Sequence, residues 1–266
     1  MTEYCDTHCH LTMAAYQEDL EFVITEARNH QVNKILVPGI DLISSRKAIQ
    51  LAEQHDFIFA AVGVHPHDAK YWEPDWLDQL SDMADHPKVV AIGEIGLDYY
   101  RNYSPAAIQE QVFQELLDLA LTKKMPVILH ERNSAQEMWP MIQRVADDFL
   151  ESFQGDWGVL HSFSGTLKAA QDAIACGLLI GISGPVTYAN ALEKQQMTQQ
   201  LPLNKLLLET DGPYLTPIPF RGKRNLPQYI PIIAAKIAQL QQCPLEQVRD
   251  STTSAANSLF FWRSGH

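Results

Sequence analysis

The chain contains 266 residues, of which 46% are hydrophobic and 20% are charged, so it is long enough for a large hydrophobic core. This length excludes a small domain stapled by disulfides. With 20 Lys and Arg against 32 Asp and Glu, the formal net charge is −12, which excludes a basic surface that holds nucleic acid regardless of sequence.

Eight short apolar runs rich in Val, Ile and Leu recur along the chain, and each is followed by a longer stretch with helical spacing. They cover residues 3–8, 34–38, 57–64, 88–94, 126–130, 157–161, 178–183 and 205–211. Runs without polar alternation are typical of parallel strands that helices cover on both faces. This α/β pattern predicts a closed (β/α)8 TIM barrel, for which about 250 residues is usual, although an open doubly wound sheet uses the same alternation.

One helix can be predicted in detail, over residues 104–124. Ser104 is expected to cap it, with Pro105 in its first turn, and Lys123 and Lys124 to end it before Pro126. Its apolar face contains Ile108, Val112, Phe113, Leu116, Leu117 and Ala120.

The sequence also bears on the number of domains and on the cellular location of the protein. No linker or low-complexity tract marks a second domain, so we expect a single domain over residues 1–266. No apolar run approaches the roughly 20 residues needed to span a bilayer. The cysteines lack paired spacing and no leader precedes Asp6, so we expect a cytoplasmic location. We also expect a monomer.

Metal-ligand residue types stand at the carboxyl ends of the predicted strands. They are His8, His10, His65, His67, Glu94, His130, His161 and Asp211. In a barrel these strand ends meet at one mouth. The spacing of His8 and His10 puts both on one face of an extended chain, with Cys9 on the other. A single histidine is most often a hydrogen-bonded structural residue, but six of the ten histidines at strand ends favour a metal centre.

Four imidazoles and two carboxylates exceed the needs of one four-coordinate ion, so we expect two divalent ions bridged by Glu94. Nitrogen ligands favour zinc, manganese, cobalt or nickel over an all-oxygen magnesium site, but zinc, manganese and magnesium all stay candidates. Asp211 could bind the first ion, accept a proton from the attacking water, or cap a following helix.

A basic run follows the last predicted strand and contains Arg221, Lys223 and Arg224. It is either a phosphate-binding loop, helped by Arg132 and Arg101 at the same mouth, or a solvated surface loop. Three tyrosines after the fourth strand offer stacking faces for a base or pack in the core; they are Tyr99, Tyr100 and Tyr103.

Taken in order, these motifs resemble the TatD family of metal-dependent deoxyribonucleases. They are DTHCHL at 6–11, GVHP at 63–66, GEIGLDY at 93–99, His130, HSFSG at 161–165, ETD at 209–211 and RGKRN at 221–225. The resemblance extends to about Asn257. It implies an amidohydrolase-type TIM barrel that hydrolyses esters with a pair of divalent ions.

The resemblance also implies a role for each matching residue. His8 and His10 would hold the first ion together with Asp211. Glu94 would bridge the ions, and His130 and His161 would hold the second. His65 would face the substrate phosphate, where a third and weaker ion could bind.

Three residues depart from the family pattern: Ser162 replaces a cysteine, Gly212 a frequent serine, and Leu226 a common acidic residue. None of these changes removes a ligand, so they concern substrate preference.

The favoured function is a 3′-5′ exodeoxyribonuclease that acts on DNA, or a hydrolase of another phosphate ester. The alternative is an amide or acyl-ester hydrolase, such as a D-aminoacyl-tRNA deacylase or a dihydroorotase-like enzyme. Related amide-cleaving barrels often use a carboxylated lysine as the bridge, so Glu94 favours the phosphoesterase. A non-catalytic metal-binding protein would be expected to lack at least one ligand, and all six are present.

Overall fold

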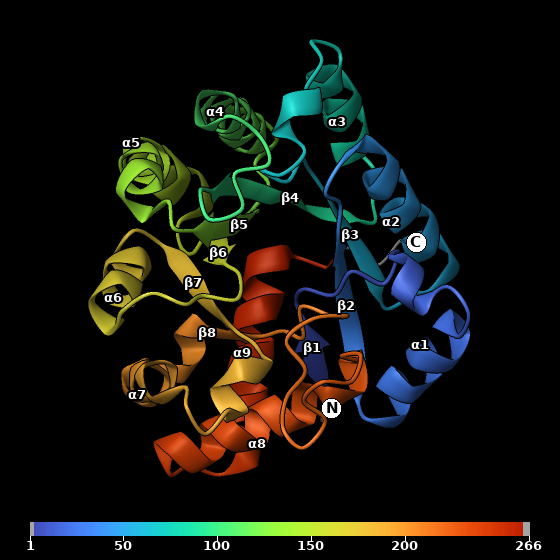
Figure 1. Ribbon diagram of the computed structural model, residues 1–266, viewed down its shortest axis with the longest axis vertical. Helices are drawn as coiled ribbons and strands as arrows, with labels where there is room; N and C mark the ends of the chain where they lie inside the picture. Colours follow the sequence, from blue (N-terminus) through green and yellow to red (C-terminus); the bar gives the residue numbers. More distant parts are fainter. Residues whose placement is uncertain (1–2, 263–266) are drawn as a thin grey trace. The chain divides into compact units, whose positions relative to one another are not determined.

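The computed structural model describes residues 3–262, which form strands and helices in alternation (Figure 1). The strands follow one another in the order β1-β2-β3-β4-β5-β6-β7-β8. This sequential order is that of a (β/α)8 barrel, and it differs from the rearranged order of a doubly wound sheet. The described chain separates into two compact units, each treated by itself below. The single domain expected from the sequence stays a prediction.

The first unit comprises residues 3–37, 162–175 and 179–258 of the described chain. Its strands are β1 (Tyr4–Asp6), β2 (Val32–Pro38), β7 (Leu178–Ile182) and β8 (Leu206–Leu208). Its helices are α1 (Leu20–Asn29), α6 (Leu167–Ala175), α7 (Leu192–Gln200), α8 (Ile230–Gln241) and α9 (Leu245–Phe260). Its 3-10 turns are Ala14–Tyr16, Gly184–Thr187, Leu203–Lys205 and Pro227–Tyr229. Parallel pairing joins β1 to β2 and β7 to β8.

The second unit comprises residues 38–161, 176–178 and 259–262. Its strands are β3 (Ile58–Val62), β4 (Val89–Asp98), β5 (Val127–Arg132) and β6 (Gly158–Leu160). Its helices are α2 (Leu42–Gln54), α3 (Trp76–Ala84), α4 (Ala106–Lys123) and α5 (Ala135–Phe153), with a 3-10 turn at Ala69–Tyr71. All ten residues of β4 are buried, as a strand covered on both faces requires.

Two strands extend past their predicted ends. β4 reaches Asp98 and β5 reaches Arg132, so Glu94 and His130 lie inside strands rather than at their ends. The extension is possible because Ile95 and Gly96 pair with Leu129 and His130 after an irregularity in the register. By contrast, β8 is short, and it ends three residues before Asp211.

Helix α4 confirms the predicted element but corrects its cap. Pro105, not Ser104, is the capping residue, and no side chain caps the helix. The Ser104 hydroxyl instead donates to the carbonyl oxygen of His67 and accepts from the N–H of Lys70. Lys124 ends the helix in the left-handed conformation, before Pro126 as predicted.

Among the described helices, none is both long enough and apolar enough to cross a lipid bilayer. None of the four cysteines, all of which lie in the described part of the chain, forms a disulfide bond.

Candidate metal centre

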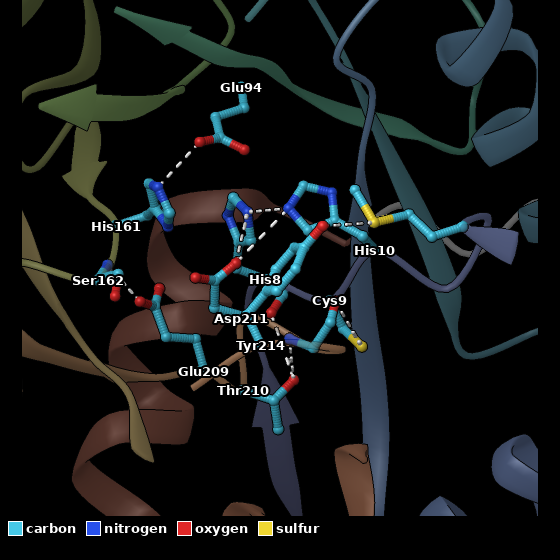
Figure 2. A network of polar contacts seen from close by, with 12 residues as sticks. His8, Cys9, His10, Glu94, His161, Ser162, Glu209, Thr210, Asp211 and Tyr214 are labelled. Carbon is cyan, nitrogen blue, oxygen red and sulfur yellow. Dashed lines mark hydrogen bonds and ion pairs between the residues drawn. The ribbon is translucent and has the colours of Figure 1, made fainter. Parts of the chain in front are cut away.

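His8, His10 and Asp211 form one group of donor atoms in the first unit (Figure 2). The two Nε2 atoms lie 3.2 Å apart, and Asp211 Oδ1 lies 3.9 Å from His8 and 3.6 Å from His10. The His8 side chain is fully buried, and the Asp211 side chain is 14% exposed. The chain from His8 to His10 is extended, and the Cys9 Sγ points the other way, toward the Tyr16 hydroxyl at 3.8 Å. The predicted sharing of one face is therefore confirmed.

Backbone pairing keeps the two segments of this group together. The Asp211 N–H donates to the carbonyl oxygen of His8, and the His10 N–H donates to that of Gly212, both at 2.8 Å. Asp211 has a φ of 53°, and the next helical element in the described chain begins only at Pro227. The alternative role of Asp211 as a helix cap is therefore wrong.

A buried carboxylate, Asp6, is hydrogen-bonded to both of these segments. Asp6 accepts hydrogen bonds from the N–H and the hydroxyl of Thr210, at 2.9 and 2.6 Å. It also accepts from the N–H of His8 at 3.3 Å. Burial raises the pKa of Asp6 to about 7, against these hydrogen bonds, which favour the ionised form. Asp6 thus links the residue before Asp211 to His8.

Glu94 is the centre of a second donor group, in the second unit. Its Oε1 lies 2.8 Å from His130 Nδ1, 2.9 Å from His161 Nε2 and 3.4 Å from His65 Nε2. Figure 2 shows the carboxylate directed at the His161 ring. The Glu94 side chain is 3% exposed. Nitrogen atoms of three imidazole rings therefore surround one carboxylate oxygen that is shielded from water.

Glycines on either side of Glu94 let β4 approach β5 closely. A Cβ on Gly93 would lie 2.6 Å from the Cβ of Ile128, and one on Gly96 would lie 2.0 Å from the carbonyl oxygen of His130. Only glycine fits at such distances. The register irregularity between β4 and β5 spans these residues, and irregularities of this kind redirect side chains.

Asp98 orients the His130 ring, although the sequence analysis assigned it no role. Its Oδ2 lies 3.2 Å from His130 Nε2 and 2.8 Å from His67 Nε2. Because an ionised carboxylate only accepts, Asp98 holds a proton on His130 Nε2, which leaves Nδ1 as the nitrogen that would face a cation. Burial lowers the pKa of His130, but the carboxylates of Asp98 and Glu94, one at each ring nitrogen, raise it above its ordinary value. A carboxylate behind a histidine ligand is a common arrangement at metal sites.

His65 presents the opposite ring atom. Its Nδ1 accepts a hydrogen bond from the His67 N–H at 3.1 Å, which places the proton of the neutral ring on Nε2. Burial lowers the pKa of His65 to about 4, so the ring is neutral near pH 7. His65 is therefore a hydrogen-bond donor toward Glu94, which differs from the acceptor nitrogen that a metal ligand needs.

Both donor groups fit divalent cations. Ligand atoms at 2.0–2.1 Å from one tetrahedral ion stand roughly 3.3 Å apart, and the donor atoms within each unit lie 2.8–3.9 Å apart. Imidazole nitrogen and carboxylate oxygen suit zinc and manganese. Several of these nitrogens face one another across a short gap, as His8 and His10 do, and a shared cation would satisfy both lone pairs.

The basic residues divide into exposed and anchored side chains. Arg221 is exposed and lies 4.3 Å from the ring of Tyr188, and Arg132 is exposed and lies 4.0 Å from the ring of Tyr100. Arg224 instead forms a two-pronged ion pair with Asp19, at 2.8 and 2.6 Å.

Of the remaining basic and aromatic candidates, all but Tyr99 are exposed. Lys223 is exposed, with its Nζ 5.7 Å from the ring of Phe220. Tyr100 and Tyr103 are exposed, so core packing is wrong for both, whereas Tyr99 is half-buried and donates to Glu110. Their proposed base stacking stays a prediction.

Two of the departures from the family pattern contact their surroundings directly. Ser162 bonds to the hydroxyl of Ser183 at 2.9 Å, and its N–H donates to the buried carboxylate of Glu209. A Cβ on Gly212 would lie 2.3 Å from the Tyr16 hydroxyl. A serine there would therefore displace Tyr16.

The chain was compared with known proteins. A family model described as TatD related DNase matches residues 5–261. An uncharacterized metal-dependent hydrolase, YabD of Bacillus subtilis, is 37% identical over 255 residues, covering 96% of this chain and 98% of that protein. The 3′-5′ ssDNA/RNA exonuclease TatD of Citrobacter rodentium is 35% identical over 260 residues, covering 96% and 97%. The crystal structure of YjjV, a TatD homologue from Escherichia coli, superimposes with a TM-score of 0.89 at 30% identity, covering 98% of each chain.

Proposed function

This chain belongs to the TatD related DNase family and is a metal-dependent hydrolase with a (β/α)8 barrel fold, and from that premise we propose that it removes nucleotides from the 3′ end of single-stranded DNA. The fold class and the hydrolase family predicted from the sequence are thereby confirmed. The observation that carries the proposal is the convergence of His130 and His161 on Glu94 Oε1, because two imidazoles and a carboxylate are suited to a catalytic divalent ion.

We propose that His8, His10 and Asp211 hold one cation, and that Glu94, His130 and His161 hold another. Bound divalent cations would supply Lewis-acid charge that stabilises phosphoryl transfer and makes water more acidic. Each role below is assigned to the chain's own side chains.

Asp211 accepts a proton from the attacking water, since its carboxylate is more exposed than that of Glu94 and lies beside His8 and His10. The Nε2–H of His65 donates a hydrogen bond to a phosphate oxygen, in keeping with its tautomer. Arg221, which is exposed and unpaired with any carboxylate among the ion pairs of the described chain, binds a second phosphate.

A 5′-labelled single-stranded oligonucleotide tests this function, together with a circular strand of the same sequence and with manganese or magnesium. We expect a ladder that shortens from the 3′ end and an intact circle. Efficient cutting of the circle would contradict exonuclease action. Deacylation of aminoacylated RNA without any DNA cleavage would instead support the acyl-ester alternative. Asp211→Asn should fold normally and lose at least about 100-fold in rate. Asp118→Asn, at an exposed position of α4, is the matched control and should keep the wild-type rate.

The predicted bridging role of Glu94 needs a count of bound ions. If Glu94 serves both ions, Glu94→Ala should abolish turnover and lower the metal content measured by elemental analysis. The loss should exceed that caused by His10→Ala, which removes one ligand of one ion. A Glu94→Ala protein with two ions per chain and the wild-type rate would refute the dinuclear assignment.

The metal identity, a third ion at His65, a cytoplasmic location and a monomeric state stay predictions. Elemental analysis, cell fractionation and light scattering of the purified protein test them.

A further inference from the structure

Asp211 is the first residue of a tight turn, and its backbone is in the left-handed conformation. Asp211 has a φ of 53°, and the Tyr214 N–H donates to the Asp211 carbonyl oxygen at 2.9 Å. Such a conformation is uncommon for a residue with a side chain, and it needs support from its surroundings. The direction of the Asp211 carboxylate therefore depends on what holds residues 210–214.

Asn225 holds this turn through hydrogen bonds from its side chain and its backbone. Its Nδ2 donates to the carbonyl oxygens of Thr210 at 2.7 Å and of Tyr214 at 2.6 Å, which lie on either side of Asp211. Its backbone N–H donates to the carbonyl oxygen of Pro213 at 3.0 Å. One side chain thus connects both ends of the turn.

The remaining polar atoms of Asn225 also have partners. Its Oδ1 accepts from the Leu226 N–H at 2.9 Å, and its carbonyl oxygen accepts from the Tyr16 hydroxyl at 2.7 Å. Asn225 and Tyr16 are both fully buried. Because a buried polar group without a partner is costly, this set of contacts admits one orientation of the amide.

Tyr16 reaches Asn225 through the space that Gly212 leaves. A Cβ on Gly212 would lie 2.3 Å from the Tyr16 hydroxyl, so the absence of a side chain there is what admits the ring. The guanidinium of Arg224 lies 5.1 Å from the centre of the Tyr16 ring and pairs with Asp19. The residue before Asn225 is thereby anchored as well.

We propose that Asn225, braced by Tyr16, is a positioning residue that holds the Asp211 carboxylate against His8 and His10 and so sets the affinity of this donor group for a divalent cation. The proposal rests on the proposed function only for the assignment of these three residues as ligands. Asn225 contacts none of the three ligand side chains, and it acts through the backbone of the turn.

The test uses the full chain freed of metal, with Mn²⁺ as the probe, and the variants Asn225→Asp, Asn225→Ala and Tyr16→Phe. Asn225→Asp keeps the acceptor for the Leu226 N–H but loses both donors. Outer partners of metal ligands typically change affinity about 10–100-fold, so calorimetric Mn²⁺ affinity should fall by that factor in Asn225→Asp and by less in Tyr16→Phe. Asn257→Ala removes a half-buried amide bonded to Lys34, and it should leave the affinity unchanged.

A second measurement separates this proposal from the ligand assignment. In the metal-free protein, the Tyr214 amide should exchange hydrogen at least about tenfold faster in Asn225→Asp than in wild type, while core amides keep their protection. In the assay, kcat should fall with KM unchanged, because Asn225 touches no substrate.

Each outcome has one meaning. Wild-type Mn²⁺ affinity in folded Asn225→Asp and Tyr16→Phe would overturn the proposal and leave the proposed function intact. Unchanged affinity in His8→Ala would overturn the ligand assignment, and the exchange rate of the Tyr214 amide would then still decide whether Asn225 holds the turn. If Asn225→Ala fails to fold, Tyr16→Phe, which loses a single hydroxyl, decides the proposal in its place.

Discussion

At the scale of single residues, Asp98 shows how a buried carboxylate can orient the ring of a neighbouring histidine, His130. Burial opposes its ionisation, but hydrogen bonds from His130, the Arg101 N–H and His67 hold the pKa of Asp98 well below its usual range. The ionised carboxylate accepts a hydrogen bond from His130 Nε2 and so holds a proton on that nitrogen. Its effect on the second donor group is therefore electrostatic as well as steric.

Asp98→Asn should retain the fold and lose about 10–100-fold in metal affinity or in rate, because an amide can donate to Nε2 and reverse the His130 tautomer. The measurement is a Mn²⁺ titration followed by kcat at saturating metal. Asp118→Asn on the exposed face of α4 controls for the loss of one charge. Wild-type affinity in Asp98→Asn would show that His130 needs no partner.

Lys194 makes a different contribution, to stability. It lies on α7, donates a hydrogen bond to the carbonyl oxygen of Phe163, and has its pKa lowered to about 8 by burial, against the charges of Glu209 and Asp211. Below pH 8 the ammonium is charged in the folded and the unfolded chain, so the cost of burying it is fully present. As the pH rises toward the unfolded value of 10.5, the folded chain loses the proton first and the cost is relieved.

We therefore expect the free energy of unfolding of the wild type to rise relative to that of Lys194→Met between pH 8 and 10.5. Urea titrations at several pH values measure the difference. Lys168→Met, at an exposed position, should show no such trend. Parallel curves for wild type and Lys194→Met would mean that Lys194 is already well solvated.

At the scale of elements, the basic loop at residues 221–225 combines side chains that anchor it to the protein with one that is exposed to solvent. Arg224 is committed to Asp19 at the start of α1, and Asn225 is buried under the Asp211 turn. Arg221 faces solvent. The loop is thus fixed at its carboxyl end and presents a cation at its amino end.

Arg221→Ala should raise KM, leave kcat nearly unchanged, and reduce the salt slope of single-strand binding by about 0.7, the value for one phosphate contact. Arg224→Ala should weaken binding without changing that slope, because its charge is already neutralised by Asp19. Fluorescence anisotropy at several salt concentrations compares the two. An equal loss of slope in both variants would mean that Arg224 also contacts phosphate.

Elements whose signal is local could be predicted from the sequence. Apolar runs located all eight strands, and proline and lysine located the end of α4. The end of β4 could not be predicted, because it depends on glycines that let β5 come within pairing distance. Ser104 was assigned to a local cap, but distant partners at His67 and Lys70 take its hydroxyl.

The candidate site, like the fold, could be predicted where the signal is local and not where it depends on distant partners. Metal-ligand residue types at the predicted strand ends pointed to the candidate ligands, and the structure places their donor atoms in two groups. Asp98 and Asn225 were missed, since a buried carboxylate or amide acquires its role only from partners far along the chain. Asp98 lies in the motif GEIGLDY and Asn225 in the motif RGKRN, so the resemblance of these motifs to the family was the one available signal.

For the whole molecule, the net charge of −12 makes binding depend on a few local cations. The affinity for single-stranded DNA protected at its 3′ end should therefore be nearly independent of length from about 6 to about 24 nucleotides. Anisotropy with fluorescein-labelled strands measures this. A steady gain in affinity with length would instead indicate a continuous binding track along the surface.

The fit between Gly212 and the Tyr16 hydroxyl has a consequence for the routes by which this protein can diverge. Gly212→Ser alone should destabilise the chain, because the new Cβ meets the hydroxyl, whereas the same substitution after Tyr16→Phe should be tolerated. A double-mutant cycle would detect the difference as a coupling between the two positions. Lineages with serine at position 212 should then be those in which position 16 had already lost its hydroxyl, so the order of substitutions is set by the geometry of one contact.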